Sequence, residues 1–215
     1  YRATNGERGT VLAAYMNYGK NGDTFNRPGI NLTNAALLAA GGSHLELGDT
    51  GMLCSEYYPG KSLRITEELS DDLRRYYSFM TAYENLLRGP GLSEIASSVY
   101  IGGNLTSSLA EKDRVWSFSK QKEDGTEICH FINLMGAAHT NWADEKGTQK
   151  EPTLLLNQTV RLYPAKIPRT VSLASPDWQR GIMAEIPFIP GKDGRGDYIE
   201  FVLPLLEYWT MIVME

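Results

Sequence analysis

Residues 41–49 read GGSHLELGD, and this short stretch decides how the first half of the chain is expected to fold. Its centre, residues 43–47, alternates polar and apolar side chains, which is the pattern of a β-strand. Successive side chains of a strand point to opposite faces, so His44 and Glu46 share one face while two leucines share the other. The Gly-Asp pair that ends at Asp49 marks the end of this strand.

The segments around this strand extend it into a repeating strand–helix order. Residues 10–16 (TVLAAYM) form a mostly apolar run, which is typical of a parallel strand covered on both faces. Residues 31–40 predict a helix, because they begin with an asparagine cap and are followed by two glycines. Apolar side chains at three- and four-residue steps predict a second helix over residues 69–87. Strands joined through helices run parallel, with right-handed crossovers.

Two parallel strands are too few to make a sheet on their own. The first 102 residues carry only these two, whereas a closed (β/α)8 barrel uses about 250 residues. We therefore expect residues 1–102 to be the back end of a larger α/β domain. The start at Tyr1, without an initiator methionine or a signal-like segment, is typical of a processed or excised piece.

The composition changes character near residues 102–103, and the second half predicts an all-β antiparallel sandwich over residues 103–215. Short runs of β-branched and aromatic residues alternate there with Gly, Pro and Asp turns. The Glu-Asp-Gly at residues 123–125 predicts a hairpin, because Asp-Gly tolerates the positive φ angles of a tight turn. The predicted strands are 114–118, 126–134, 153–156, 159–163, 170–173, 181–188, 198–203 and 208–214.

Charge and hydropathy exclude several classes of partner. The chain has 215 residues with 21 Lys and Arg against 26 Asp and Glu, a formal net charge of −5, and no basic block, so nucleic acid is not expected to bind. Every apolar stretch is broken well short of the roughly 20 residues that a membrane-spanning helix needs. Cys54 and Cys129 lack the spacing of a zinc or redox site, and we expect two free, buried thiols. The histidines lack zinc-ligand spacing and no phosphate-cradling loop occurs, so no metal or cofactor is expected.

The candidate site residues follow the two predicted strands of the first half. In a barrel, the face that carries His44 and Glu46 is expected to point inward, with Asp49 at the C-terminal rim where such barrels keep their active sites. Asn17 and Tyr18 follow the other strand and are expected at the same rim. Aromatic faces, amides and carboxylates together suit the binding of sugars. The alternative is that the His/Glu pair satisfies itself inside the barrel and that the loop is an ordinary polar loop.

Five consecutive blocks of the first half resemble glycoside hydrolase family 66, which comprises endo-dextranases and cycloisomaltooligosaccharide glucanotransferases. The blocks are AAYMNY (13–18), FNRPGINLTNAALLAAGG (25–42), GGSHLELGD (41–49), MLCSEYYPG (52–60) and SDDLRRYYSFMTAYENLLRG (70–89). The resemblance implies that the two strands are the last two of a (β/α)8 barrel, and that a β-sandwich domain follows. It further implies an α-1,6-linked glucan substrate and cleavage that retains configuration through an Asp nucleophile and a Glu acid/base.

Both catalytic carboxylates would lie on earlier barrel strands, upstream of this chain, so no catalytic residue is assigned here. The remainder of the catalytic barrel is then an obligatory partner. His44, Glu46, Asn17, Tyr18 and Asp49 are expected to bind the glucose units of dextran or isomaltooligosaccharides at the rim. A dissenting possibility is that Glu46 itself is the acid/base.

The resulting hypothesis is a retaining endo-glycosidase that hydrolyses dextran. The glucanotransferases carry an extra carbohydrate-binding module after the penultimate strand, whereas residues 17–28 are only a short loop, and this favours hydrolysis over cyclisation. Cyclisation, or a non-catalytic carbohydrate-binding or packing module in which the sandwich is the working part, are the alternatives. Because polymeric dextran cannot cross a cell envelope, an extracellular or cell-envelope location is expected.

Overall fold

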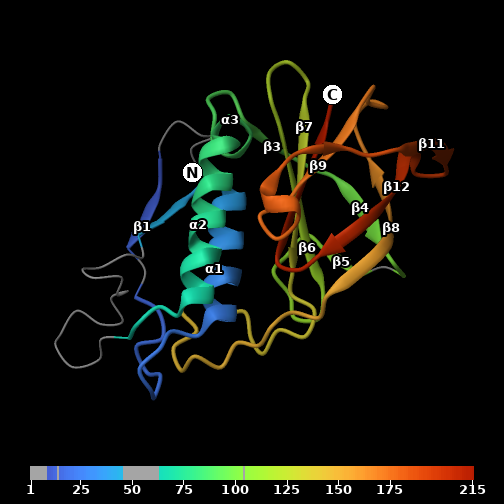
Figure 1. The fold of residues 1–215 in the computed structure, drawn as a ribbon. Helices are drawn as coiled ribbons and strands as arrows, with labels where there is room; N and C mark the ends of the chain where they lie inside the picture. Colours follow the sequence, from blue (N-terminus) through green and yellow to red (C-terminus); the bar gives the residue numbers. More distant parts are fainter. Residues whose placement is uncertain (1–8, 14, 46–62, 104) are drawn as a thin grey trace.

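The computed structural model describes residues 9–13, 15–45, 63–103 and 105–215, arranged in four layers (Figure 1). At one side of the molecule, β1 (Val11–Ala13) and β2 (Ser43–Leu45) form a parallel pair. The next layer holds α1 (Arg27–Ala40), α2 (Glu67–Ala82) and the short α3 (Glu84–Leu87). Two larger sheets form the third and fourth layers.

The third layer is a seven-stranded sheet whose strands lie in the order β10, β9, β13, β7, β6, β3, with β5 also paired to β6. Its strands are β3 (Ser93–Ile95), β5 (Thr106–Ser107), β6 (Val115–Gln121), β7 (Glu127–Asn133), β9 (Val171–Ala174), β10 (Ala184–Glu185) and β13 (Trp209–Met214). The fourth layer has the order β11, β12, β8, β4. Its strands are β4 (Ser98–Ile101), β8 (Leu155–Tyr163), β11 (Phe188–Asp193) and β12 (Gly196–Leu206). A 3-10 turn, η3 (Gln179–Gly181), follows β9.

The helices begin and end where local chemistry places their boundaries. α1 starts earlier than predicted, after an extended Asn26, because Pro28 lies in its first turn, where a missing N–H costs nothing. It ends at Gly41, whose φ of 92° is the left-handed conformation that glycine adopts readily. In α2 the side chain of Thr66 accepts a hydrogen bond from the N–H of Leu69, which caps the first turn.

Three hydrophobic clusters separate the four layers. The first lies between the two large sheets and includes Phe131 and Phe201. The second lies between the helices and the seven-stranded sheet, where Tyr76 and Trp209 are buried. The third lies between the helices and the residues near β1, and Leu12 packs against it. The helices therefore bury apolar side chains on two sides, which holds the β1–β2 pair to the large sheets.

Lys120 of β6 ties the helical layer to the seven-stranded sheet. Its side chain is buried, and its Nζ donates hydrogen bonds of 2.7 Å to the carbonyl of Ala39 in α1 and of 2.7 Å to that of Leu87 in α3. The last carbonyls of a helix lack intrahelical partners and carry the negative end of the helix dipole. A single amino group therefore satisfies the ends of two helices at once.

The large sheets begin before the predicted domain boundary at residue 102. Strands β3 and β4 lie within residues 93–101 and pair antiparallel with β6 and β8. No strand is predicted at β3, because its side chains are mostly exposed and polar. The parallel order of β1 and β2 agrees with the strand order expected for residues 10–47, while the assignment of this pair to a (β/α)8 barrel stays a prediction.

Two further expectations concern buried thiols and membrane spans. Cys129 is free and buried, and burial raises the pKa of its thiol to about 12. Cys54 lies outside the described residues. Among the helices that the structure describes, none combines the length and the apolar character that crossing a membrane would require.

Candidate functional site

Asn17 joins the loop that follows β1 to the long loop between β7 and β8. Its backbone N–H donates to the carbonyl of Ala143 at 3.0 Å, and its Nδ2 donates to the carbonyl of Asp144 at 2.7 Å. Its Oδ1 accepts from the N–H of Asn26 at 2.8 Å. Asn17 is fully buried with a φ of 56°, a left-handed conformation that asparagine tolerates better than most residues. The amide of Asn17 therefore holds two loops together inside the protein, and its contact with substrate stays a prediction.

Asp144 is the centre of the hydrogen-bond network to which Asn17 belongs. Only 1% of its surface is exposed, and its carboxylate accepts from Asn26 Nδ2 at 2.6 Å and from the backbone N–H of Thr148 at 2.7 Å. His139 Nε2 lies 3.1 Å from the same carboxylate. A buried carboxylate is stable only when such donors replace its water. The network is therefore best explained as structural support for the two loops.

Gly29 shows how closely α1 approaches this carboxylate. A Cβ at Gly29 would lie 2.3 Å from Oδ2 of Asp144, well inside the distance of any real contact. Since the hydrogen bonds of Asp144 fix the carboxylate, a larger residue at position 29 would have to displace it. Glycine at this position thus lets the first turn of α1 pack directly against the loop.

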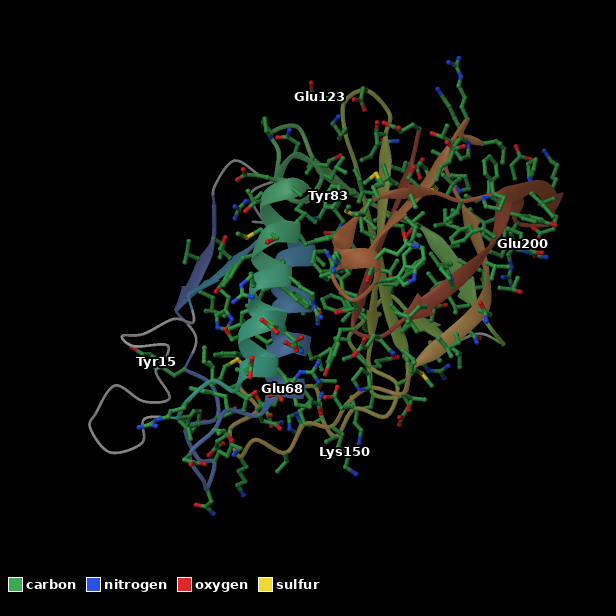
Figure 2. The ribbon with its side chains drawn as sticks, viewed as in Figure 1. Tyr15, Glu68, Tyr83, Glu123, Lys150 and Glu200 are labelled. Carbon is green, nitrogen blue, oxygen red and sulfur yellow. The ribbon has the colours of Figure 1, made fainter. Side chains whose placement is uncertain are left out.

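Among the predicted site residues that the structure describes, Tyr18 has the most accessible side chain. It is 40% exposed, and the preceding aromatic residue of the loop, Tyr15, is 41% exposed. Partial desolvation, together with a hydrogen bond and the negative charge of Glu145, raises the pKa of Tyr18. Figure 2 shows Tyr15 at the side of the molecule formed by the β1 layer. These rings offer a stacking surface next to the end of β1.

His44 faces the helices rather than the open side of the β1–β2 pair. Its Nδ1 lies 3.0 Å from Oδ1 of Asn34 on α1, and only 6% of the residue is exposed. Its cross-strand partner Leu12 also packs toward the helices. Alternation predicts which residues share a face but not which face the helices cover. The role of His44 at a barrel rim stays a prediction.

The remaining predicted site residues, Glu46 and Asp49, lie outside the described residues, and their assignment stays a prediction. Within the part of the chain that the structure describes, no group of three or more His, Cys, Asp or Glu side chains is placed to hold a metal ion.

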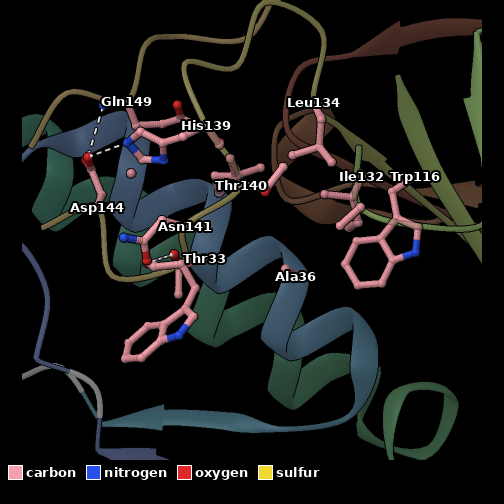
Figure 3. A pocket seen from close by; sticks show the side chains of 14 residues that line it. Thr33, Ala36, Trp116, Ile132, Leu134, His139, Thr140, Asn141, Asp144 and Gln149 are labelled. Carbon is pink, nitrogen blue, oxygen red and sulfur yellow. Dashed lines mark hydrogen bonds and ion pairs between the residues drawn. The ribbon is translucent and has the colours of Figure 1, made fainter. Parts of the chain in front are cut away.

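A narrow pocket opens between α1, the loop that contains His139 and the edge of the seven-stranded sheet (Figure 3). Trp116 lies at one end of the pocket, and His139 and Asp144 lie at the other. Its volume is about 70 Å³, whereas ligand pockets usually reach several hundred Å³. Thr33 on its wall donates to the carbonyl of Trp142 at 2.7 Å. The pocket is too small for a sugar chain. It is a packing gap between the loop and α1.

A second polar cluster, which the sequence pattern did not reveal, links the helices to the long loop. Asp72 of α2 accepts from Arg27 Nε at 2.5 Å and from Asn31 Nδ2 at 2.5 Å, and it also pairs with Arg75. Arg27 Nη1 lies 2.8 Å from Glu151, whose carboxylate is hydrogen-bonded to the hydroxyl of Tyr208. The i,i+3 spacing of Asp72 and Arg75 was the one available sequence signal, since the other partners lie far apart in the chain.

Comparison with known proteins shows the family of the chain. Residues 1–213 match the model of glycosyl hydrolase family 66, so the chain belongs to this family. A cycloisomaltooligosaccharide glucanotransferase of Niallia circulans is 35% identical over 89% of the chain, and a dextranase of Streptococcus salivarius is 30% identical over 100% of it. The chain spans only 20% of the first relative and 28% of the second.

A solved structure shares the fold of the described residues. It is a Paenibacillus cycloisomaltooligosaccharide glucanotransferase in complex with cycloisomaltoheptaose, with a TM-score of 0.81 and 37% sequence identity. The match covers 89% of this chain and 28% of the other. The resemblance inferred from the sequence blocks is thereby confirmed.

Proposed function

We propose that the chain is the C-terminal part of a retaining endo-glycosidase that hydrolyses the α-1,6 linkages of dextran. The observation that carries the proposal is the family match over residues 1–213, with a dextranase among the relatives. Because the chain spans a small share of these relatives, the reaction is proposed for the longer protein to which it corresponds.

The arrangement of the first two layers supports this proposal. β1 and β2 run parallel, and α1 lies against one face of the pair, where it contacts His44. On the other face Val11 is 69% exposed, an unusual state for a valine in a strand. We infer that the β1–β2 pair, with this exposed face, continues into the remaining strands of a (β/α)8 barrel, and that the two large sheets are its C-terminal sandwich.

In the proposed reaction, this chain binds sugar units and the rest of the barrel supplies the catalytic carboxyl groups. Retention of configuration needs two carboxyl groups about 5 to 5.5 Å apart, one attacking and one protonating the leaving oxygen. We place both upstream of this chain. Tyr18, Glu46 and Asp49 would bind sugar units at the rim, while Asn17 and His44 hold the loops and the strand in position.

Cyclisation is the second candidate reaction, because the glucanotransferase of Niallia circulans and the Paenibacillus structure are both similar to the chain. A retaining glucosyl-enzyme intermediate can be released by water, giving a linear product, or by a sugar hydroxyl, giving a transfer product. The short loop of residues 17–28 favours the first outcome. We further propose that the longer protein is exported, since its polymeric substrate lies outside the cell.

The test uses the longer protein with dextran. Mass spectrometry of early products should show linear oligosaccharides, and proton NMR of the first turnovers should show the α-anomer. Cyclic products as the main species would support glucanotransfer instead. If the longer protein converted dextran into neither linear nor cyclic products, the proposal would be overturned.

A carboxyl-to-amide pair tests the rim assignment. Glu46→Gln should lower kcat/KM at least about tenfold, because a lost charged hydrogen bond weakens transition-state binding. Glu185→Gln, which changes an exposed carboxylate of β10, should leave kcat/KM unchanged. Equal activity of the two variants would remove Glu46 from the proposed site.

A further inference from the structure

The outer face of the four-stranded sheet carries a row of three tyrosines that the proposed reaction does not use. Tyr100 of β4, Tyr163 of β8 and Tyr198 of β12 are each half-buried. The ring centroids of Tyr100 and Tyr163 are 5.9 Å apart, and those of Tyr163 and Tyr198 are 5.8 Å apart. The ring planes are inclined to each other by 78° and 57°, so the three rings form a stepped aromatic surface across three neighbouring strands. We call this surface, with the charged residues between the rings, the tyrosine platform.

Charged side chains of both signs lie between the rings of the tyrosine platform. Arg161 donates to Glu200 at 3.0 Å and lies 3.5 Å from Asp193, and its guanidinium is 4.1 Å from the ring centroid of Tyr198. The hydroxyl of Tyr163 donates to Asp193 at 2.7 Å. This bond lowers the pKa of Asp193, so the carboxylate stays charged and available as an acceptor. The platform thus alternates apolar rings with donors and acceptors.

Glycines beside the tyrosine platform leave room above the rings and allow close packing of Tyr198. A hollow of about 600 Å³ lies over the part of the platform formed by Tyr100 and Tyr163, with Gly102, Gly103 and Gly194 at its margin. A Cβ at Gly191 would lie 2.4 Å from the ring of Tyr198, so glycine at this position lets the ring lie flat on β11. Figure 2 shows Glu200 on the side of the molecule away from Tyr15 and the helices. The hollow is therefore separate from the loop that follows β1.

We propose that the tyrosine platform binds a stretch of an α-linked glucan chain, away from the barrel rim. Sugar rings present C–H faces that pack on aromatic rings and hydroxyls that pair with guanidinium and carboxylate groups. The two arginines and two acids of the platform balance in charge, which suits a neutral ligand and not a phosphate or an acidic polymer. The identity of the sugar rests on the proposed function.

One contact must open for a sugar to reach the first ring. The guanidinium of Arg195 is 4.6 Å from the ring centroid of Tyr100. Arg195 lies in the turn between β11 and β12 and is exposed, and cation–π contacts at exposed sites are weak. A glucose unit can therefore displace the guanidinium, which then remains nearby to donate to the hydroxyls.

The test measures binding of the full chain to dextran by affinity electrophoresis in native gels. The wild-type chain should be retarded by dextran, and the double variant Tyr100→Ala/Tyr163→Ala should raise the apparent Kd about tenfold, since two stacking surfaces are lost. Tyr163→Phe, which keeps the ring, should stay close to wild type. Val202→Ala is the matched control, because Val202 is 54% exposed on the same strand as Tyr198.

Two results would overturn the inference: no retardation of the wild-type chain, or equal retardation of the wild type and the double variant. A urea midpoint for each variant shows that the fold is intact. Turnover of a short isomaltooligosaccharide by the longer protein tests the proposed function by itself, because such a substrate is too small to occupy the rim and the tyrosine platform together. The double variant should leave this turnover unchanged and lower only the turnover of polymeric dextran.

Discussion

The two large sheets differ in how many of their faces are covered. Every residue of β7 and of β13 in the seven-stranded sheet is buried, whereas β12 in the four-stranded sheet alternates between buried and more exposed positions. The helices cover one face of the first sheet and the second sheet covers the other, while the second sheet is covered on one face only. An antiparallel strand therefore loses its alternation when a third layer is added. The comparison also shows which sheet has a face left for a ligand.

The largest expected effects test this difference in coverage. Phe131→Ala, on the face toward the four-stranded sheet, and Ile132→Ala, on the face toward the helices, should destabilise the chain by about 4 and about 3 kcal/mol. On β12, Phe201→Ala should cost about 4 kcal/mol, but its neighbour Val202→Ala should cost less than about 0.5 kcal/mol. Urea unfolding followed by tryptophan fluorescence measures all four. If Ile132→Ala cost as little as Val202→Ala, the helices would not form a true third layer.

The polar link between the helices and the covered sheet should give the next largest effect. Lys120→Met leaves the carbonyls of Ala39 and Leu87 without their buried donor, which should lower the free energy of unfolding by about 3 kcal/mol. Lys192→Met is the control on the four-stranded sheet, where the lysine side chain is 76% exposed and the change should be near zero. A similar small loss in both variants would mean that packing alone holds the helices.

A smaller, pH-dependent effect on stability should come from Asp177, which lies between α2 and the seven-stranded sheet. Its carboxylate accepts from the N–H groups of Tyr208 and Trp209 at 3.0 and 2.9 Å and from the hydroxyl of Tyr76 at 3.1 Å. Burial raises its pKa to about 7, so the folded state holds the proton to higher pH than the unfolded chain does. Stability from this group is therefore present at low pH and is lost as pH rises from about 4 through about 7, with a loss of about 1 kcal/mol between pH 6 and pH 7.

Asp177→Asn isolates this contribution. Burial lowers the pKa of His130, which acts in the opposite direction because its unfolded form takes up the proton first. The difference between the wild type and Asp177→Asn cancels that background. Urea unfolding at several pH values should show this difference changing between pH 4 and pH 7, and a constant difference would contradict the raised pKa.

The smallest expected effect concerns the open face. Arg195→Ala removes the cation–π contact with Tyr100 and should lower stability by about 0.5 kcal/mol. The same urea experiment measures it. A loss of unfolding free energy comparable to that of Lys120→Met would mean that Arg195 is needed to hold the outer face together. It would then not be a group that a ligand displaces.

The sequence predicts elements well where burial produces a strong local pattern. The runs rich in β-branched and aromatic residues at 126–134 and 208–214 correspond to β7 and β13, and the helical periodicity from residue 69 corresponds to α2. The predicted helix 69–87 is interrupted at Tyr83, where α3 begins, because apolar spacing alone does not register a break of one residue. Strands β3 to β5 are too short to show a pattern.

The predicted site residues show where such reasoning ends. Asn17 is expected at the barrel rim, but its partners Ala143 and Asp144 lie more than a hundred residues further along the chain, and no local pattern contains them. Alternation predicts which of residues 43–47 share a face, yet the side that α1 covers is a property of the tertiary structure. Two partners of Asn17 lie far along the chain and one of His44 lies on the preceding helix, so a strand pattern contains none of these contacts.

The junction between Asn17 and Asp144 has a consequence for how such proteins can be recombined. The loop after β1 does not set its own conformation, since the loop between β7 and β8 supplies hydrogen-bond partners more than a hundred residues away in the sequence. A chimera that receives this loop from a homologue must therefore also receive residues 139–149. Transferred alone, the loop would lack the hydrogen-bond partners that fix its conformation.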